Sequence, residues 1–190
     1  ILNALYALNR DYLQVRSGVE GITHPYLNVG LISGGTNTNV IPGKVVLKLD
    51  RRLIPEEDPA EVEAALRETI ARAAASFSPP RGGKSLKVDV RRLLLARAMQ
   101  PLPGNAGLVQ ALQRHAGQVF GEPIPAVGTP LYTDVRLYVE RGIPGVIYGA
   151  GPRTVRESNA KRADEHVRLD DLRRATKVVA RALLDLLSAG

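Results

Sequence analysis

Residues 44–52 have the sequence KVVLKLDRR, in which apolar and charged side chains alternate along the chain. A period of two residues predicts a β-strand with one buried and one exposed face. The alternation places Leu47 and Leu49 on the apolar face, and Asp50 with Arg52 side by side on the other. We therefore expect a sheet whose outer face carries a carboxylate beside a guanidinium.

The segments around this strand predict a small α+β domain. Residues 1–16 have helical apolar spacing, and residues 26–33 form a second strand. Asp58 and Pro59 suit the N-cap and first position of a helix that extends to Phe77. After a turn at residues 79–83, alternation over residues 86–91 predicts a third strand. With one strand placed before it, this order is the ferredoxin-like β-α-β-β-α-β plan, an antiparallel sheet with helices on one face.

The pattern changes near residue 98. Helices are predicted over residues 104–120, 133–142 and 169–187. The apolar run 143–148 ends at Gly149-Ala150-Gly151, which favours a buried parallel strand whose following loop lies where α/β sheets bind ligands. We expect two α/β parts: a domain at residues 1–97 that lacks its first strand, and the C-terminal part of a larger domain at residues 98–190.

Composition excludes several functional classes. The chain has no Cys, so disulfides and thiol chemistry are excluded, and any metal site would depend mainly on carboxylates and the three His. The net charge of +7 is spread along the chain, and the chain has two Phe and no Trp, so we expect no nucleic-acid partner. No apolar run is long enough to span a membrane and no signal peptide precedes the first helix, so we expect no membrane partner and a cytoplasmic location.

Four clusters could carry chemistry, and each has a structural alternative. Asn39, in the loop 34–42, contacts a polar ligand or belongs to a plain strand connection. Arg52 binds a carboxylate through its two-pronged donor or only pairs with Asp50. Residues 133–136 begin a helix or contribute to a site. Gly149 and Gly151 admit a ligand close to the backbone or merely turn the chain.

The order of these clusters resembles a known family of zinc-dependent amidohydrolases and exopeptidases, that of acetylornithine deacetylase, succinyl-diaminopimelate desuccinylase, aminoacylase and glutamate carboxypeptidase. Its lid (dimerisation) domain is matched by Gly34-Gly35-Thr36-x-x-Asn39-Val40-Ile41-Pro42 and by Asp50-x-Arg52-Leu53-x-Pro55. The end of its catalytic domain is matched by Thr133-Asp134-x-Arg136, Gly142-Ile143-Pro144, Tyr148-Gly149-x-Gly151 and Asp164-Glu165.

The resemblance implies a two-domain homodimer with a dinuclear zinc centre that cleaves an amide bond of an N-acyl amino acid or peptide. In such enzymes the metals activate a water and polarise the carbonyl. Asn39 and Arg52 fall on lid positions that hold the carboxylate side of the substrate, often across the dimer. Gly149 and Gly151 fall where backbone groups contact substrate.

The chain departs from the family at its metal centre. The segment with the first zinc ligands and the base, and the catalytic His before the first lid helix, are absent, and Lys161 occupies the position of the last His ligand. A protonated Lys cannot coordinate zinc. We therefore expect no catalytic or metal-ligating residue in this chain. It is either part of such a hydrolase or a non-catalytic homologue that keeps dimerisation or small-acid binding.

Overall fold

The computed structural model describes residues 1–79, 83–151 and 155–188, and they divide into two compact units. The first unit comprises Ile1–Ala98 with Gly128–Leu131, and the second comprises Met99–Val127 and the described residues from Tyr132 onward. The boundary predicted between residues 97 and 98 would divide a lid domain from part of a catalytic domain, and it stays a prediction.

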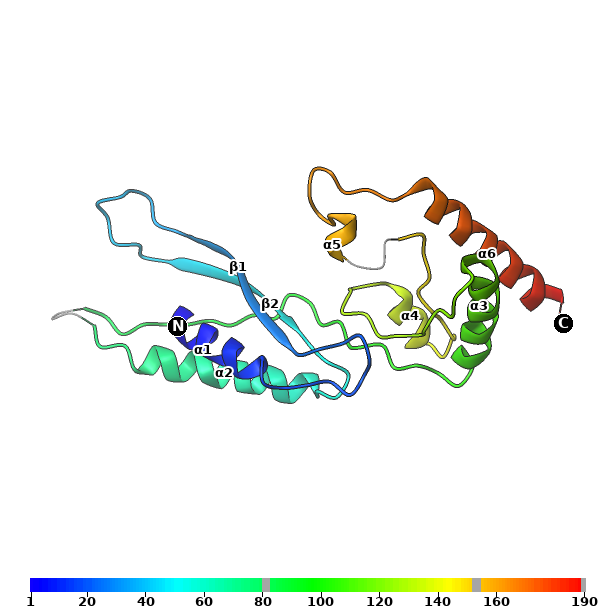
Figure 1. Ribbon diagram of the computed structural model, residues 1–190. Helices are drawn as coiled ribbons and strands as arrows, with labels where there is room; N and C mark the ends of the chain where they lie inside the picture. Colours follow the sequence, from blue (N-terminus) through cyan, green and yellow to red (C-terminus); the bar gives the residue numbers. More distant parts are fainter. Residues whose placement is uncertain (80–82, 152–154, 189–190) are drawn as a thin grey trace. The chain divides into compact units, whose positions relative to one another are not determined.

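The first unit has helix α1 (Leu2–Tyr12), strands β1 (Tyr26–Gly34) and β2 (Val45–Arg52), and helix α2 (Pro59–Ala75). The strands form an antiparallel hairpin, and both helices lie along one face of it (Figure 1). Leu5 of α1, Leu27 of β1, and Leu66 with Ile70 of α2 form the core. The predicted order of helix, strand, strand and helix is therefore confirmed.

Local signals set the limits of these elements. Asp58 caps α2 by accepting hydrogen bonds from the Ala60 and Glu61 amides at 2.8 and 3.0 Å, and Pro59 opens the helix. By contrast, α1 ends at Tyr12, earlier than the predicted end near Ser17-Gly18. Residues 13–15 continue only as turns, because their side chains are exposed and gain nothing by packing in a further helical turn.

The predicted strand at residues 86–91 is wrong as a paired strand, since among the described residues the sheet has only β1 and β2. The segment is nevertheless held beside α2: Arg67 donates to the Val90 carbonyl at 2.7 Å, and Arg92 pairs with Glu63 at 2.6 Å. In a split β-α-β plan, strands joined by a helix are not neighbours, because another strand lies between them. In that plan, residues 86–91 would pair with the strand that lies between them and β2. The described residues contain no strand at that place, so the backbone of residues 86–91 forms no ladder. The turn predicted at residues 79–83 lies largely outside the described residues.

The second unit has helices α3 (Asn105–Phe120), α4 (Val135–Val139), α5 (Val155–Ser158) and α6 (Leu169–Ser188), and α3 packs against α6. The predicted helices over residues 104–120, 133–142 and 169–187 are confirmed, although α4 is shorter than predicted. The predicted buried strand at residues 143–148 is wrong: no strand is assigned there, and Ile143 and Ile147 are each 51% exposed. A parallel strand needs flanking strands for its hydrogen bonds, and the described part of this unit contains none. No helix among the described residues is long and apolar enough to cross a membrane.

Candidate substrate-binding site

The strongest candidate site is the outer face of the hairpin where β2 ends. The strand register places Asn28 opposite Asp50 and Tyr26 opposite Arg52. Arg52 Nε donates to Asp50 Oδ2 at 2.6 Å, and 44% of the Arg52 side chain is exposed. Within the described chain this is the one hydrogen bond of that side chain, so its two Nη atoms are left for a ligand. An exposed pair of this kind adds little stability, whereas a planar guanidinium binds a carboxylate well.

Asn39 does not join Arg52 in this structure. It lies in the loop that connects β1 and β2, at the far end of the hairpin from the end of β2 (Figure 1). The Asn37 side chain accepts a hydrogen bond from the Thr38 amide at 2.8 Å and shapes this loop. The strand between the loop and Arg52 is about 23 Å long, at roughly 3.3 Å per residue. One small carboxylate therefore cannot touch Asn39 and Arg52 of the same chain.

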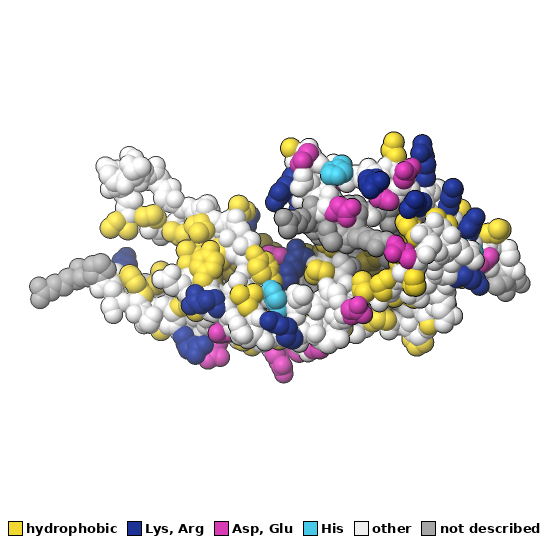
Figure 2. Space-filling view, in the orientation of Figure 1, with side chains coloured by type: hydrophobic (Ala, Val, Ile, Leu, Met, Phe, Trp, Pro, Cys, Tyr) yellow, Lys and Arg dark blue, Asp and Glu magenta, His cyan; other side chains and the backbone are white. Residues whose placement is uncertain are grey.

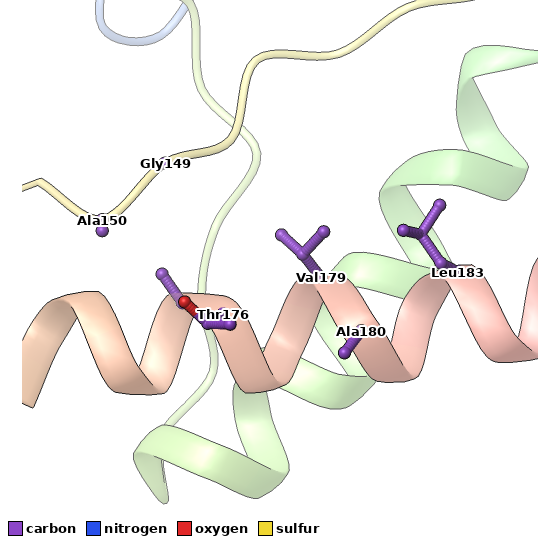
Figure 3. A pocket seen from close by; sticks show the side chains of 7 residues that line it. Gly149, Ala150, Thr176, Val179, Ala180 and Leu183 are labelled. Atoms are coloured by element: carbon purple, nitrogen blue, oxygen red, sulfur yellow. The ribbon is translucent and has the colours of Figure 1, made fainter.

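Gly149 lies in the second unit, in the wall of an open groove of about 380 Å³. The other lining residues are Ala150 and the α6 residues Ala175, Thr176, Val179, Ala180 and Leu183 (Figure 3). Thr176 donates its hydroxyl to the Leu172 carbonyl at 2.8 Å, so the groove is chiefly apolar. It suits a hydrocarbon group better than a carboxylate.

Gly149 and Gly151 are not required by local geometry. Apart from the chain neighbours, a Cβ added at either position would meet no atom of the described residues within 4 Å, and neither glycine has a positive φ. The chain bends at Ala150 between the two glycines, so both interpretations, approach of a ligand and a turn of the chain, stay predictions. Pro152, which follows Gly151, lies outside the described residues.

The segment 158–166 forms a closed turn around Lys161. The His166 amide donates to the Ser158 carbonyl at 3.1 Å and closes the turn. Asp164 accepts from the Asn159 side chain at 2.6 Å, and Glu165 accepts from the Lys161 amide at 2.7 Å. Lys161 has a φ of 65°, so its backbone adopts the left-handed conformation that residues other than Gly seldom occupy. Both carboxylates of the predicted Asp-Glu pair therefore accept hydrogen bonds within the turn.

The described residues do not fit a dinuclear zinc centre. No group of three or more His, Cys, Asp or Glu that could hold a metal occurs among them. Lys161 carries an ammonium group with donors and no lone pair for a cation. Whether the chain holds a metal stays a prediction.

Arg51 is a residue of the site that the sequence motifs missed. It faces the interior, where its guanidinium lies 4.0 Å from the centre of the Tyr12 ring and pairs with Glu57 at 2.5 Å. It also donates to the carbonyl of Arg52. The signal was present in the alternation of KVVLKLDRR, since Arg51 follows Leu47 and Leu49 on the apolar face. A charged residue in that register indicates a buried ion pair.

Thr133 and Arg136 have local roles in α4. The Thr133 hydroxyl accepts from the Val135 amide at 3.4 Å, and Arg136 contacts Glu140 and Tyr132 at 3.3 and 3.2 Å. These contacts favour the structural alternative for this cluster.

Comparisons with known proteins place these features in a class. Residues 1–77 match the model of the peptidase dimerisation domain. Residues 1–77 are therefore similar to the dimerisation domain of M20 peptidases, and the resemblance noted in the sequence is confirmed.

Two relatives describe the match in more detail. An acetylornithine deacetylase from Myxococcus xanthus is 30% identical over 171 residues, which cover 86% of this chain and 39% of that protein. The chain thus spans about two fifths of the length of this curated relative. The crystal structure of an M20 family metallo-carboxypeptidase, Sso-CP2 from Sulfolobus solfataricus, aligns with a TM-score of 0.45 and 20% identity, covering 85% of this chain and 37% of that one.

Proposed function

We propose that this chain supplies the substrate-holding and dimer-forming part of a metal-dependent hydrolase that cleaves an amide bond of an N-acyl amino acid or peptide. The observation that carries the proposal is the Asp50–Arg52 pair, placed on the outer face of a peptidase dimerisation domain. Arg52 would bind the carboxylate of the substrate, while Asp50 orients Arg52 through Nε. Gly149 and Gly151 would let the substrate approach the backbone in the second unit.

Binding of N-acetyl-L-ornithine, measured by calorimetry, tests the role of Arg52. Arg52→Lys keeps the charge but loses the two-pronged donor, so affinity should fall on the order of tenfold or more. Arg72→Met removes another exposed Arg of the same unit and should leave affinity unchanged. Equal binding by wild type and Arg52→Lys would refute the proposed carboxylate site.

We further propose that the chain forms a homodimer through its first unit. The hairpin exposes apolar side chains (Figure 2), with Leu31 61%, Ile32 56% and, in the loop between the strands, Ile41 92% exposed. A second copy would cover these residues and bring its Asn39 toward the other chain's substrate, which accounts for the separation of Asn39 from Arg52. Sedimentation equilibrium should show a dimer that Leu31→Asp/Ile32→Asp converts to a monomer. Leu187→Asp, at an exposed position of the second unit, should leave it dimeric. A wild-type monomer would refute this part.

A second function is a non-catalytic, small-acid-binding homologue. Lys161 favours it, because this side chain stands where the resemblance calls for a zinc-ligating His. Zinc content and hydrolysis of N-acetyl-L-ornithine, measured on the protein as isolated from its own cells, separate the two functions. Stoichiometric zinc with turnover favours the hydrolase, and binding without zinc or turnover favours the homologue. The cytoplasmic location is part of the proposal and is tested by fractionation.

A further inference from the structure

We propose that Arg51 is a positioning residue for Arg52, holding the backbone that presents the Arg52 guanidinium to a carboxylate. The inference rests on the proposed function of Arg52. The two residues are neighbours in β2, and their side chains emerge on opposite faces of the sheet. Arg52 faces outward, while the Arg51 side chain is only 8% exposed.

The guanidinium of Arg51 is fixed on three sides. It stacks on the ring of Tyr12 at 4.0 Å, its Nη2 pairs with Glu57 at 2.5 Å, and its Nη1 donates to the carbonyl of Arg52. Tyr12 ends α1, and Glu57 lies in the loop that leads to α2. The backbone at Arg52 is therefore tied to the end of α1 and to the loop before α2 through one buried side chain.

Two carboxylates hold the turn that follows Arg52. The second oxygen of Glu57 accepts from the Ile54 amide at 3.0 Å. Glu56 accepts from the Gly18 amide at 2.8 Å and from the Ser17 hydroxyl at 3.0 Å. These hydrogen bonds tie the turn to the segment after α1. The backbone on both sides of Arg52 is consequently held, although among the described residues the Arg52 side chain itself makes one hydrogen bond, to Asp50.

A purely structural role accounts less well for a buried Arg at this position. Burying an ion pair costs desolvation, and apolar side chains of similar size often give equal stability. Arg51 Nε is also buried with no hydrogen-bond partner among the described residues. What an apolar side chain cannot reproduce is the hydrogen bond to the Arg52 carbonyl. Misplacing a binding group by a small distance lowers its effect steeply.

The test uses a variant that removes both charges of the pair. Arg51→Met/Glu57→Gln leaves no unpaired buried charge and keeps a Gln oxygen for the Ile54 amide. The matched control, Arg72→Met/Glu68→Gln, removes an exposed ion pair from α2. Folding of each variant is checked by thermal unfolding.

Two readouts respond to positioning. The first is the Nε–H signal of Arg52 in protein labelled with ¹⁵N-arginine, assigned by its loss in Arg52→Lys and recorded without ligand. The second is the affinity for N-acetyl-L-ornithine relative to its methyl ester, which lacks the carboxylate charge. In Arg51→Met/Glu57→Gln the signal should shift and exchange with water on the order of tenfold faster, and the preference for the acid should fall about tenfold. The control should change neither.

The outcomes separate this inference from the proposed function. An unchanged Arg52 signal and acid preference in folded Arg51→Met/Glu57→Gln overturns the positioning role. Failure of the proposed function gives a different result: wild type then binds N-acetyl-L-ornithine no better than its methyl ester. In that case the Arg52 Nε–H signal, recorded without ligand, tests the positioning role alone. If that variant does not fold, Arg51→Lys takes its place. It retains the charge but cannot make all three contacts, so the same two changes are expected.

Discussion

The side chain of Asn105 makes hydrogen bonds in both directions with the backbone of Gly145. Its amide donates to the Gly145 carbonyl at 2.7 Å, and its oxygen accepts from the Gly145 N–H at 3.3 Å. Asn105 is the first residue of α3 and is buried. The contact fixes the segment after α4, which leads to Gly149, against the start of α3.

Asn105→Ala should destabilise the second unit by about 2 kcal/mol, because it leaves the N–H and the carbonyl of Gly145 without their partner. The shift in the urea midpoint measures the effect. Gln110→Ala changes an exposed side chain of the same helix and should stay within about 0.5 kcal/mol of wild type. Equal stability of the two variants would show that the contact is not formed in solution.

Gly21→Ala should disrupt the attachment of residues 128–131 to the first unit. Gly21 has a φ of +89°, and an added Cβ would lie 2.2 Å from the carbonyl oxygen of Gly128. The amide of Gly128 donates to the Glu20 carbonyl at 2.7 Å. Stability should fall by more than about 1 kcal/mol, and the Gly128 amide should exchange faster with solvent. Gly43→Ala has open space around it and should not lower stability; Gly128 exchange unchanged in Gly21→Ala would contradict the packing.

Asp58→Ala should cost about 1 kcal/mol, because it removes the acceptor for two amides at the start of α2. Asp58→Asn keeps a capping oxygen and should lose only a fraction of this. Chemical denaturation compares the three proteins. Similar losses in both variants would mean that the charge of Asp58, rather than the cap, stabilises the helix.

The hairpin and α2 could be predicted because their signals are local. The alternation through β2 defines its two faces, and Asp58-Pro59 marks the start of α2. The strands predicted at 86–91 and 143–148 could not be settled in this way, because a strand exists only with a hydrogen-bonding neighbour. Alternation shows that a segment suits a sheet, and says nothing about whether the neighbouring strand is present.

The candidate site was predictable to the same extent. The pairing of Asp50 with Arg52 followed from their spacing of two on one face, and the structure brings them within 2.6 Å. The contacts of Arg51 with Tyr12 and Glu57 were not predictable, because they depend on how α1 and the loop before α2 pack below the strand. The distance between Asn39 and Arg52 likewise requires the hairpin to be built first.

The stability of the second unit should depend on pH through Asp185 of α6. His115 Nε2 lies 2.6 Å from Asp185 Oδ2, and Arg114 pairs with the same oxygen at 2.5 Å. The hydrogen bond from His115, with help from Arg114, lowers the pKa of Asp185 below its ordinary value of 3.8. The unfolded chain therefore binds the proton more readily than the folded one.

It follows that the contribution of Asp185 to stability is complete above pH 3.8 and is lost as the pH falls through the lowered pKa of the folded state. Asp185→Asn should be less stable than wild type at neutral pH, and the difference should shrink below pH 3.8. Urea midpoints measured across the acid range test this. Asp170→Asn, which loses an exposed ion pair with Arg173 at 3.3 Å, serves as the control. Parallel curves for wild type and Asp185→Asn down to the lowest pH would show that the pKa of Asp185 is the same in the folded and unfolded chains.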